Sequence, residues 1–212
     1  MKPLKTTVQL FLLLLLLGTA ASSWGALTGP GSISYNNGLY ALDDNWTNPI
    51  TTLSWNVAQL AGGNYEYDYS FTLPSDAKNI SHVIIQVSDN FTSADISAGT
   101  TPGWELNTWD GQGNSNLGIP APLFGLKWDT GEVTSFAWSI ITDRAPTMGN
   151  FYAKDGNSNG GTYAYSGTLG QFGNNVVVPD SLGTAAVPIP GAAWLLGSGL
   201  VGLIGIRRRE RK

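Results

Sequence analysis

Nine consecutive residues, 65–73, alternate without exception between apolar and polar side chains. The apolar set is Tyr65, Tyr67, Tyr69, Phe71 and Leu73. Successive side chains of a strand point to opposite faces, so this period of two predicts a strand with one buried and one wet face. Between residues 27 and 180, no stretch has the 3.6-residue apolar period of an amphipathic helix. The pattern therefore favours an all-β domain.

Further segments between residues 27 and 180 are predicted to be strands, because β-branched and aromatic residues dominate them. These segments are 32–42, 51–57, 82–87, 124–128, 133–141, 151–154, 162–167 and 175–178. Turn-forming residues separate the strands, as at Asn36-Asn37-Gly38. Their spacing predicts an antiparallel β-sandwich or jelly roll. The Gly-, Asn- and Pro-rich stretch 97–122 is expected to be a long excursion over the surface.

Ionisable residues are divided unevenly between the central domain and the two ends. The segment 27–186 holds four basic residues and fourteen acidic ones, which gives it a net charge of -10. An acidic domain repels phosphate backbones, which argues against nucleic acid as a partner. The chain has no cysteine, so disulfides, zinc–thiolate sites and cysteine nucleophiles are excluded.

The N-terminal residues 1–26 have the three parts of a secretory signal peptide. Lys2 and Lys5 precede a ten-residue apolar run, 8–17, and small residues follow it. As a helix this run spans about 15 Å, too short for a bilayer core of about 30 Å, which argues against a permanent anchor. We expect cleavage by signal peptidase after Ala21 or Ser23, and the sequence does not choose between them.

The C-terminal part is predicted to hold a linker (181–190), a transmembrane helix (191–206) and a basic cytoplasmic tail (207–212). Residues 191–206 carry no charge and include five glycines, and a helix of this length spans about 24 Å, marginal for a bilayer core. The basic cluster consists of Arg207, Arg208 and Arg209. Positively charged flanks stay in the cytoplasm, so the domain 27–180 should lie outside.

The start of this segment carries a short motif. The motif residues are Val187, Pro188, Ile189 and Pro190. The motif, the apolar run and the arginines together, residues 187–209, resemble the PEP-CTERM class of bacterial sorting signals, in its Val-Pro-Leu-Pro-Ala variant. The chain departs from that variant in having Ile189 for Leu and Gly191 for Ala.

The resemblance implies where the chain goes. It implies export from a Gram-negative cell, an inner-membrane intermediate, and processing by an exosortase-type transpeptidase. Release, or attachment at the cell surface or in the extracellular matrix, would follow. Many organisms with this system make extracellular polysaccharide. An unprocessed C-terminal anchor is the alternative for the same segment.

One loop has the opening half of a calcium-binding pattern. Asp155, Asn157 and Asn159 alternate before Gly160, and oxygen ligands around a glycine turn suit Ca²⁺. The closing Glu is missing, because Ser166 occupies the twelfth position. A plain hairpin loop is therefore the competing interpretation. No other cofactor is indicated.

Two patterns bear on catalysis. His82 is the only histidine and lies at the start of a predicted strand, with no Gly-x-Ser-x-Gly motif nearby, so a structural or surface role is favoured. Glu66 and Asp68 share the wet face of one strand, roughly 6–7 Å apart, a spacing that glycoside hydrolysis allows. We nevertheless expect a protein that is not an enzyme, with a secreted hydrolase as the last alternative.

The tryptophans allow a further interpretation. Trp104 and Trp109 lie in the predicted surface excursion, and large rings there suit stacking against sugars. The competing interpretation places tryptophans in the core of a domain without disulfides. The sequence thus favours a non-enzymatic surface or matrix protein, with a carbohydrate-binding module retained in exopolysaccharide as the alternative.

Overall fold

The computed structural model describes residues 27–42, 46–112, 115–156 and 161–179. The predicted signal peptide, sorting motif, transmembrane helix and basic cluster (Arg207 to Arg209) lie outside these residues. Among the described residues, no helix is long and apolar enough to span a bilayer.

The described residues form thirteen strands and one short 3-10 helix, η2 (Ser93–Asp95), which confirms the prediction of an all-β domain. The strands are β1 (Gly29–Tyr35), β2 (Gly38–Leu42), β3 (Thr52–Gln59), β4 (Tyr65–Thr72), β5 (Ile80–Gln86), β6 (Trp104–Trp109), β7 (Leu123–Val133), β8 (Ser135–Thr142), β9 (Pro146–Gly149), β10 (Phe151–Asp155), β11 (Tyr163–Thr168), β12 (Gln171–Phe172) and β13 (Val176–Pro179). Every predicted strand is present. Strands β6, β9 and β12 were not predicted.

One hydrogen-bonded sheet contains eleven of these strands, in the order β6-β7-β5-β10-β11-β2-β1-β3-β4-β8, with β12 joined to β11. Strands β9 and β13 form a separate pair. All pairings are antiparallel except that of β1 with β2. These two strands are one segment interrupted at Asn36 and Gly38, whose φ angles of 62° and 81° turn the chain sideways. The chain thereby passes from one half of the sheet to the other.

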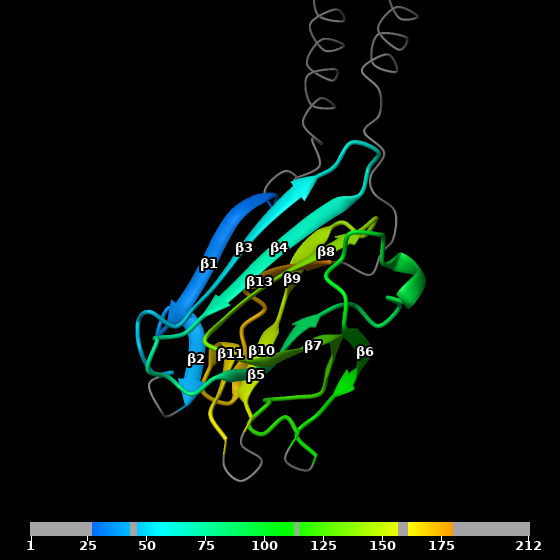
Figure 1. Cartoon of the computed structure of the whole chain (residues 1–212). Helices are drawn as coiled ribbons and strands as arrows, with labels where there is room; N and C mark the ends of the chain where they lie inside the picture. The colour runs from blue at the N-terminus through cyan, green and yellow to red at the C-terminus, as the bar shows by residue number, and fades with distance from the viewer. Residues whose placement is uncertain (1–26, 43–45, 113–114, 157–160, 180–212) are drawn as a thin grey trace, which may run out of the picture.

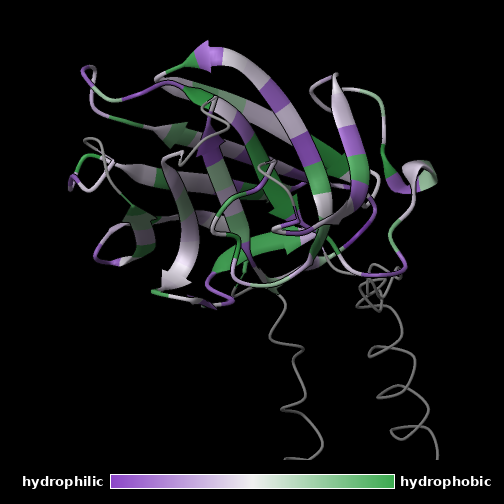
Figure 2. Cartoon of the chain, turned by 90° about the horizontal axis from the view of Figure 1, so that it is seen from below, coloured by the Kyte–Doolittle hydropathy of each residue, from purple (hydrophilic) through white to green (hydrophobic). Residues whose placement is uncertain are grey.

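The sheet curls so that its two halves face each other (Figure 1). We call β1, β3, β4 and β8 the β3 half, and β2, β11, β10, β5, β7 and β6 the β5 half. Their inner faces share one hydrophobic core, in which Phe71 of β4 lies 5.0 Å from Phe151 of β10 between ring centroids. Trp138 of β8 packs 6.0 Å from Trp128 of β7. Hydrophilic and hydrophobic residues alternate along the strands in Figure 2, as the pattern at 65–73 predicts.

The segment 97–122 does more than the predicted surface excursion. Its first residues run beside β8, its middle forms β6 against β7, and residues 110–112 and 115–119 cover the outside of the β5 half. The prediction was wrong because loop-like composition does not exclude pairing with a distant strand. Trp104 to Trp109 alternates like a strand within Gly-rich surroundings.

Threonine side chains close the free edge of β8. Thr101 donates its backbone N–H to the carbonyl of Ser139 at 3.0 Å and accepts the Ser139 N–H on its hydroxyl at 2.9 Å. The hydroxyl of Thr100 accepts the N–H of Ile141 at 2.9 Å. At the other end of the sheet, β6 makes no backbone hydrogen bond beyond β7 in the described part of the chain.

Replacing Thr101 by valine is expected to destabilise the domain by about 1–2 kcal/mol, because the Ser139 N–H loses its acceptor. The variant should also self-associate more readily, since an unpaired edge is a template for further strands. Urea unfolding and light scattering measure both effects. Thr108→Val is the matched control, because Thr108 is exposed and its hydroxyl makes no hydrogen bond to any described residue. Equal behaviour of the two variants would contradict this account of the edge.

The two ends of the described domain lie at the same end of the curled sheet. Gly29 pairs with Val57, whose row continues through β4 to Ile140 near the end of β8. Pro179 pairs with Pro146, which follows the end of β8 by four residues. A chain that enters and leaves at one end can be tethered there without distorting the sheet.

Candidate functional site

The outside of the β3 half is a polar sheet face. Register places Ser54, Ser70 and Ala137 side by side on β3, β4 and β8. The next row on the same face contains Asn56, Asp68 and Ser139. These side chains point away from the core because they alternate with buried residues along each strand.

A hollow of about 490 Å³ lies over these two rows. Short side chains form its floor, and Thr101, held against the edge of β8, borders it. A volume of this size falls in the range of small-ligand sites. The hollow is therefore a consequence of small residues on three neighbouring strands and of the segment that closes the β8 edge.

Most of the polar side chains that line the hollow make hydrogen bonds within the protein, and Asn56 is the clearest exception. The hydroxyl of Ser139 donates to Oδ1 of Asp68 at 2.5 Å, and the hydroxyl of Ser54 donates to the carbonyl of Ser70 at 3.4 Å. The side chain of Asn56 is exposed and makes no hydrogen bond to any described residue. No Lys or Arg is among the residues that line the hollow.

Glu66 and Asp68 lie on the same outer face of β4, as their spacing predicts. Asp68 lines the hollow and Glu66 does not. In register, Glu66 lies between Ala58 and Ile141, which supply no polar side chain. The structure therefore keeps the two carboxylates on one face and brings only Asp68 to the hollow.

Trp104 and Trp109 lie on opposite faces of β6, because five positions separate them along a strand. Trp104 packs against the main core. Trp109 packs against the smaller cluster outside the β5 half, and its indole N–H donates to the carbonyl of Gly125 at 2.9 Å. Lys127 Nζ lies 5.1 Å from its ring centroid. The structure thus does not bring these two candidate sugar-stacking rings together.

Residues 110–112 and 115–119 form a cover over the outside of the β5 half, and His82 lies beneath it. His82 Nε2 is 3.1 Å from Oδ1 of Asn116, and the hydroxyl of Tyr152 donates to the carbonyl of Leu117 at 2.7 Å. Gly118 lies against the ring of Tyr163, where a Cβ would collide with the ring. The cover explains why the strand at 80–86 is buried on both faces.

Burial, together with the positive charges of Lys127 and Lys154, lowers the pKa of His82 to about 4. The imidazole is therefore neutral at physiological pH. Its contact with the Asn116 amide joins the cover to β5. Sequence reasoning missed Asn116, because 34 residues separate it from His82.

The predicted calcium ligands are only in part among the described residues. Asp155 is 2% exposed, and Lys154 Nζ lies 3.9 Å from its Oδ1. Asn157 and Asn159 lie outside the described residues. Within the described ranges, no group of three or more His, Cys, Asp or Glu side chains is arranged to hold a metal ion.

The calcium hypothesis predicts a higher melting temperature in calcium than in chelator, because an ion that binds only the folded state stabilises it. At a calcium concentration one hundred times Kd, the gain would be about 2.7 kcal/mol. Scanning calorimetry measures it. Asn157→Ala should remove the gain and Asn107→Ala, on exposed β6, should not. A melting temperature that calcium leaves unchanged would end the hypothesis.

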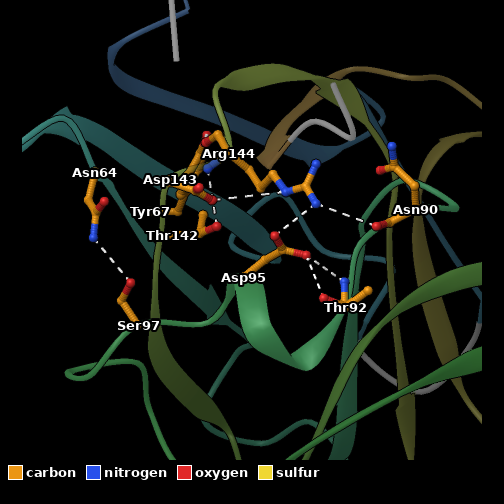
Figure 3. A network of polar contacts seen from close by, with 9 residues as sticks. All are labelled: Asn64, Tyr67, Asn90, Thr92, Asp95, Ser97, Thr142, Asp143 and Arg144. Carbon is orange, nitrogen blue, oxygen red and sulfur yellow. Dashed lines mark hydrogen bonds and ion pairs between the residues drawn. The ribbon is translucent and has the colours of Figure 1, made fainter. Parts of the chain in front are cut away.

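A polar network beside η2 joins distant loops (Figure 3). Arg144 Nη2 lies 2.8 Å from Oδ1 of Asp95 and donates to the carbonyl of Asn90 at 3.4 Å. The N–H and hydroxyl of Thr92 donate to Oδ2 of Asp95 at 2.7 and 2.9 Å. Burial alone would raise the pKa of Asp95, but the hydrogen bonds from Arg144 and Thr92 outweigh it and lower the pKa. The network thus ties Arg144 to the segment from Asn90 to Asp95.

Comparison with protein-family models, with curated proteins and with solved structures finds no match for this chain.

Proposed function

We propose that this chain is an exported, non-enzymatic protein of the cell surface or extracellular matrix, sorted by a PEP-CTERM-type signal at its C-terminus. One observation carries the proposal: the order of a Val187–Pro190 motif, sixteen uncharged residues and an arginine cluster at the end of the chain. Export requires signal peptidase, and sorting requires an exosortase-type transpeptidase in the inner membrane.

The domain suits this role. We assign the domain to the antiparallel β-sandwiches of jelly-roll type, because the two halves of its curled sheet enclose one core. A core rich in large aromatic side chains holds the domain without disulfides. Entry and exit of the chain at one end support tethering through residues 181–190.

Intact-mass measurement of the mature protein from its native host tests the proposal. We expect a species that has lost the N-terminal segment up to Ala21 or Ser23 and the C-terminal Arg207 to Lys212. A mature species that retains Arg207 to Lys212 would overturn processing at the sorting signal.

Substitution at the motif links processing to its residues. The double variant Pro188→Ala with Pro190→Ala should accumulate in the inner membrane with its C-terminus uncut. Pro122→Ala is the matched control, because Pro122 is exposed and lies in the central domain. Normal processing of the double variant would contradict the assigned motif.

A carbohydrate-binding role is the second candidate, and the hollow outside the β3 half favours it. Trp104→Ala and Trp109→Ala test whether the rings of β6 take part. If they do, each variant should lose affinity for polysaccharide.

A further inference from the structure

We infer that the hollow outside the β3 half binds a neutral, hydroxyl-rich glycan chain, with Asn56, Asp68 and Ser139 as its main hydrogen-bonding groups. The inference deepens the carbohydrate-binding role proposed above by giving it a site and a ligand class. It differs from the stacking hypothesis, because the hollow contains neither Trp104 nor Trp109.

The hydrogen-bonding groups of the hollow match the chemistry of sugar hydroxyls. Such a hydroxyl both donates and accepts hydrogen bonds, and the site offers both kinds of partner. Asn56 supplies an amide that donates and accepts, and Asp68 supplies acceptors. Ser139 fixes Oδ1 of Asp68 at 2.5 Å, which orients the carboxylate before a ligand arrives.

The charge of the hollow excludes anionic ligands. Asp68 is the only acidic side chain among the lining residues, and Glu66 is the next residue along β4 on the same face. With no lysine or arginine lining the hollow, a carboxylate, sulfate or phosphate would meet repulsion without a compensating ion pair. Glycans of uronic acids are therefore disfavoured.

An apolar ligand fits no better. It would cover Asn56 and Asp68 without replacing the hydrogen bonds that these groups make to water, at a cost of about 1–3 kcal/mol for each group. A ligand that brings many neutral hydroxyls avoids that cost. The polar rows also continue beyond the hollow, through Ser32 on β1 and Thr52 on β3, so a chain can extend past one sugar.

The three aromatic residues that line the hollow, Trp55, Tyr69 and Trp138, also pack with the core, so binding should depend mainly on hydrogen bonds in contact with water and should be weak. We expect a Kd of about 0.1–1 mM for an oligosaccharide, a range in which many copies on one polymer still give firm retention.

Titration calorimetry with defined oligosaccharides tests the inference. The full chain is kept in a zwitterionic detergent that has no sugar headgroup. The neutral probes are cellohexaose, mannohexaose, maltohexaose and xylohexaose, and the anionic probe is hexagalacturonate. We expect at least one neutral probe to bind and the anionic probe not to bind.

Three variants place that binding in the hollow. Asn56→Ala and Asp68→Asn should each weaken binding by about tenfold. Ser70→Tyr should abolish it, because Ser70 lies on the central strand of the floor and a tyrosine there fills the hollow. Asp89→Asn is the control for the lost negative charge, because Asp89 is exposed and does not line the hollow. Melting curves check that each variant is folded.

The contradicting outcomes are distinct. If no neutral probe binds, or if Ser70→Tyr binds like the unaltered chain, the inference is wrong. A lysine-rich peptide is a further probe. If the unaltered chain binds this peptide but none of the neutral probes, and Ser70→Tyr does not bind the peptide, the hollow is assigned to a basic protein partner instead. Failure of the sorting proposal would appear in the terminal masses and would leave these titrations unchanged.

Discussion

Replacing Arg144 by methionine is expected to lower the free energy of unfolding by about 3 kcal/mol, within the range for breaking a buried ion pair. The guanidinium is 11% exposed and the Asp95 side chain 14%, so water replaces the lost partner poorly. The variant leaves the carboxylate of Asp95 with the hydrogen bonds of Thr92 alone. Denaturant unfolding followed by tryptophan fluorescence measures the loss.

Lys127→Met is the matched control for this prediction. Lys127 also forms an ion pair, 3.1 Å from Asp129, but the Asp129 side chain is 69% exposed. An exposed pair contributes at most about 1 kcal/mol. If Arg144→Met costs no more than Lys127→Met, the network of Figure 3 does not anchor the loop that contains η2.

Acidification from pH 7 to pH 4 is expected to lower the stability of the domain by about 3 kcal/mol through His82 alone. The folded pKa of His82 is about 4, below its ordinary value of 6.5. Between these two values the unfolded chain binds a proton that the folded chain excludes, so unfolding becomes easier as the pH falls. Above pH 6.5 the contribution is complete.

Burial sets the direction of this effect, and the charged groups that face His82 modify its size. Lys127 and Lys154 disfavour the protonated ring, and Asp129 favours it less strongly. Because His82 is the only histidine, His82→Asn should remove most of the slope between pH 4.5 and 7. Protonation of Asp95 destabilises the fold only at lower pH, since the pKa of Asp95 is below its ordinary value. A slope that persists in His82→Asn would refute the account.

Local patterns predicted most of the strands but not what lies beside them. The alternation at 65–73 predicted β4 and its buried face. The run at 82–87 was predicted to be a strand, and β5 is buried on both faces because residues 110–112 and 115–119 cover its outer side. That cover was not predictable, since its contacts to His82 and Tyr152 join residues more than thirty positions apart.

The hollow also could not be predicted from the sequence. It depends on the register that places Asp68 of β4 beside Ser139 of β8, 71 residues away. A shift of one residue would turn Asp68 toward the core. Trp104 and Trp109 are a second example of what the sequence could not predict. Both lie in one Gly-rich stretch, but only the structure shows that β6 turns them to opposite faces.

The two edges of the large sheet differ, and the difference limits how chains can assemble. Thr100 and Thr101 occupy the edge at β8, whereas β6 is uncovered in the described part of the chain. If two chains pair through β6, both open edges are used and the assembly ends as a symmetric pair. Growth into a fibre would require a second open edge on each chain. By occupying the β8 edge, the hydroxyls of Thr100 and Thr101 thus prevent this edge from pairing with a strand of another chain.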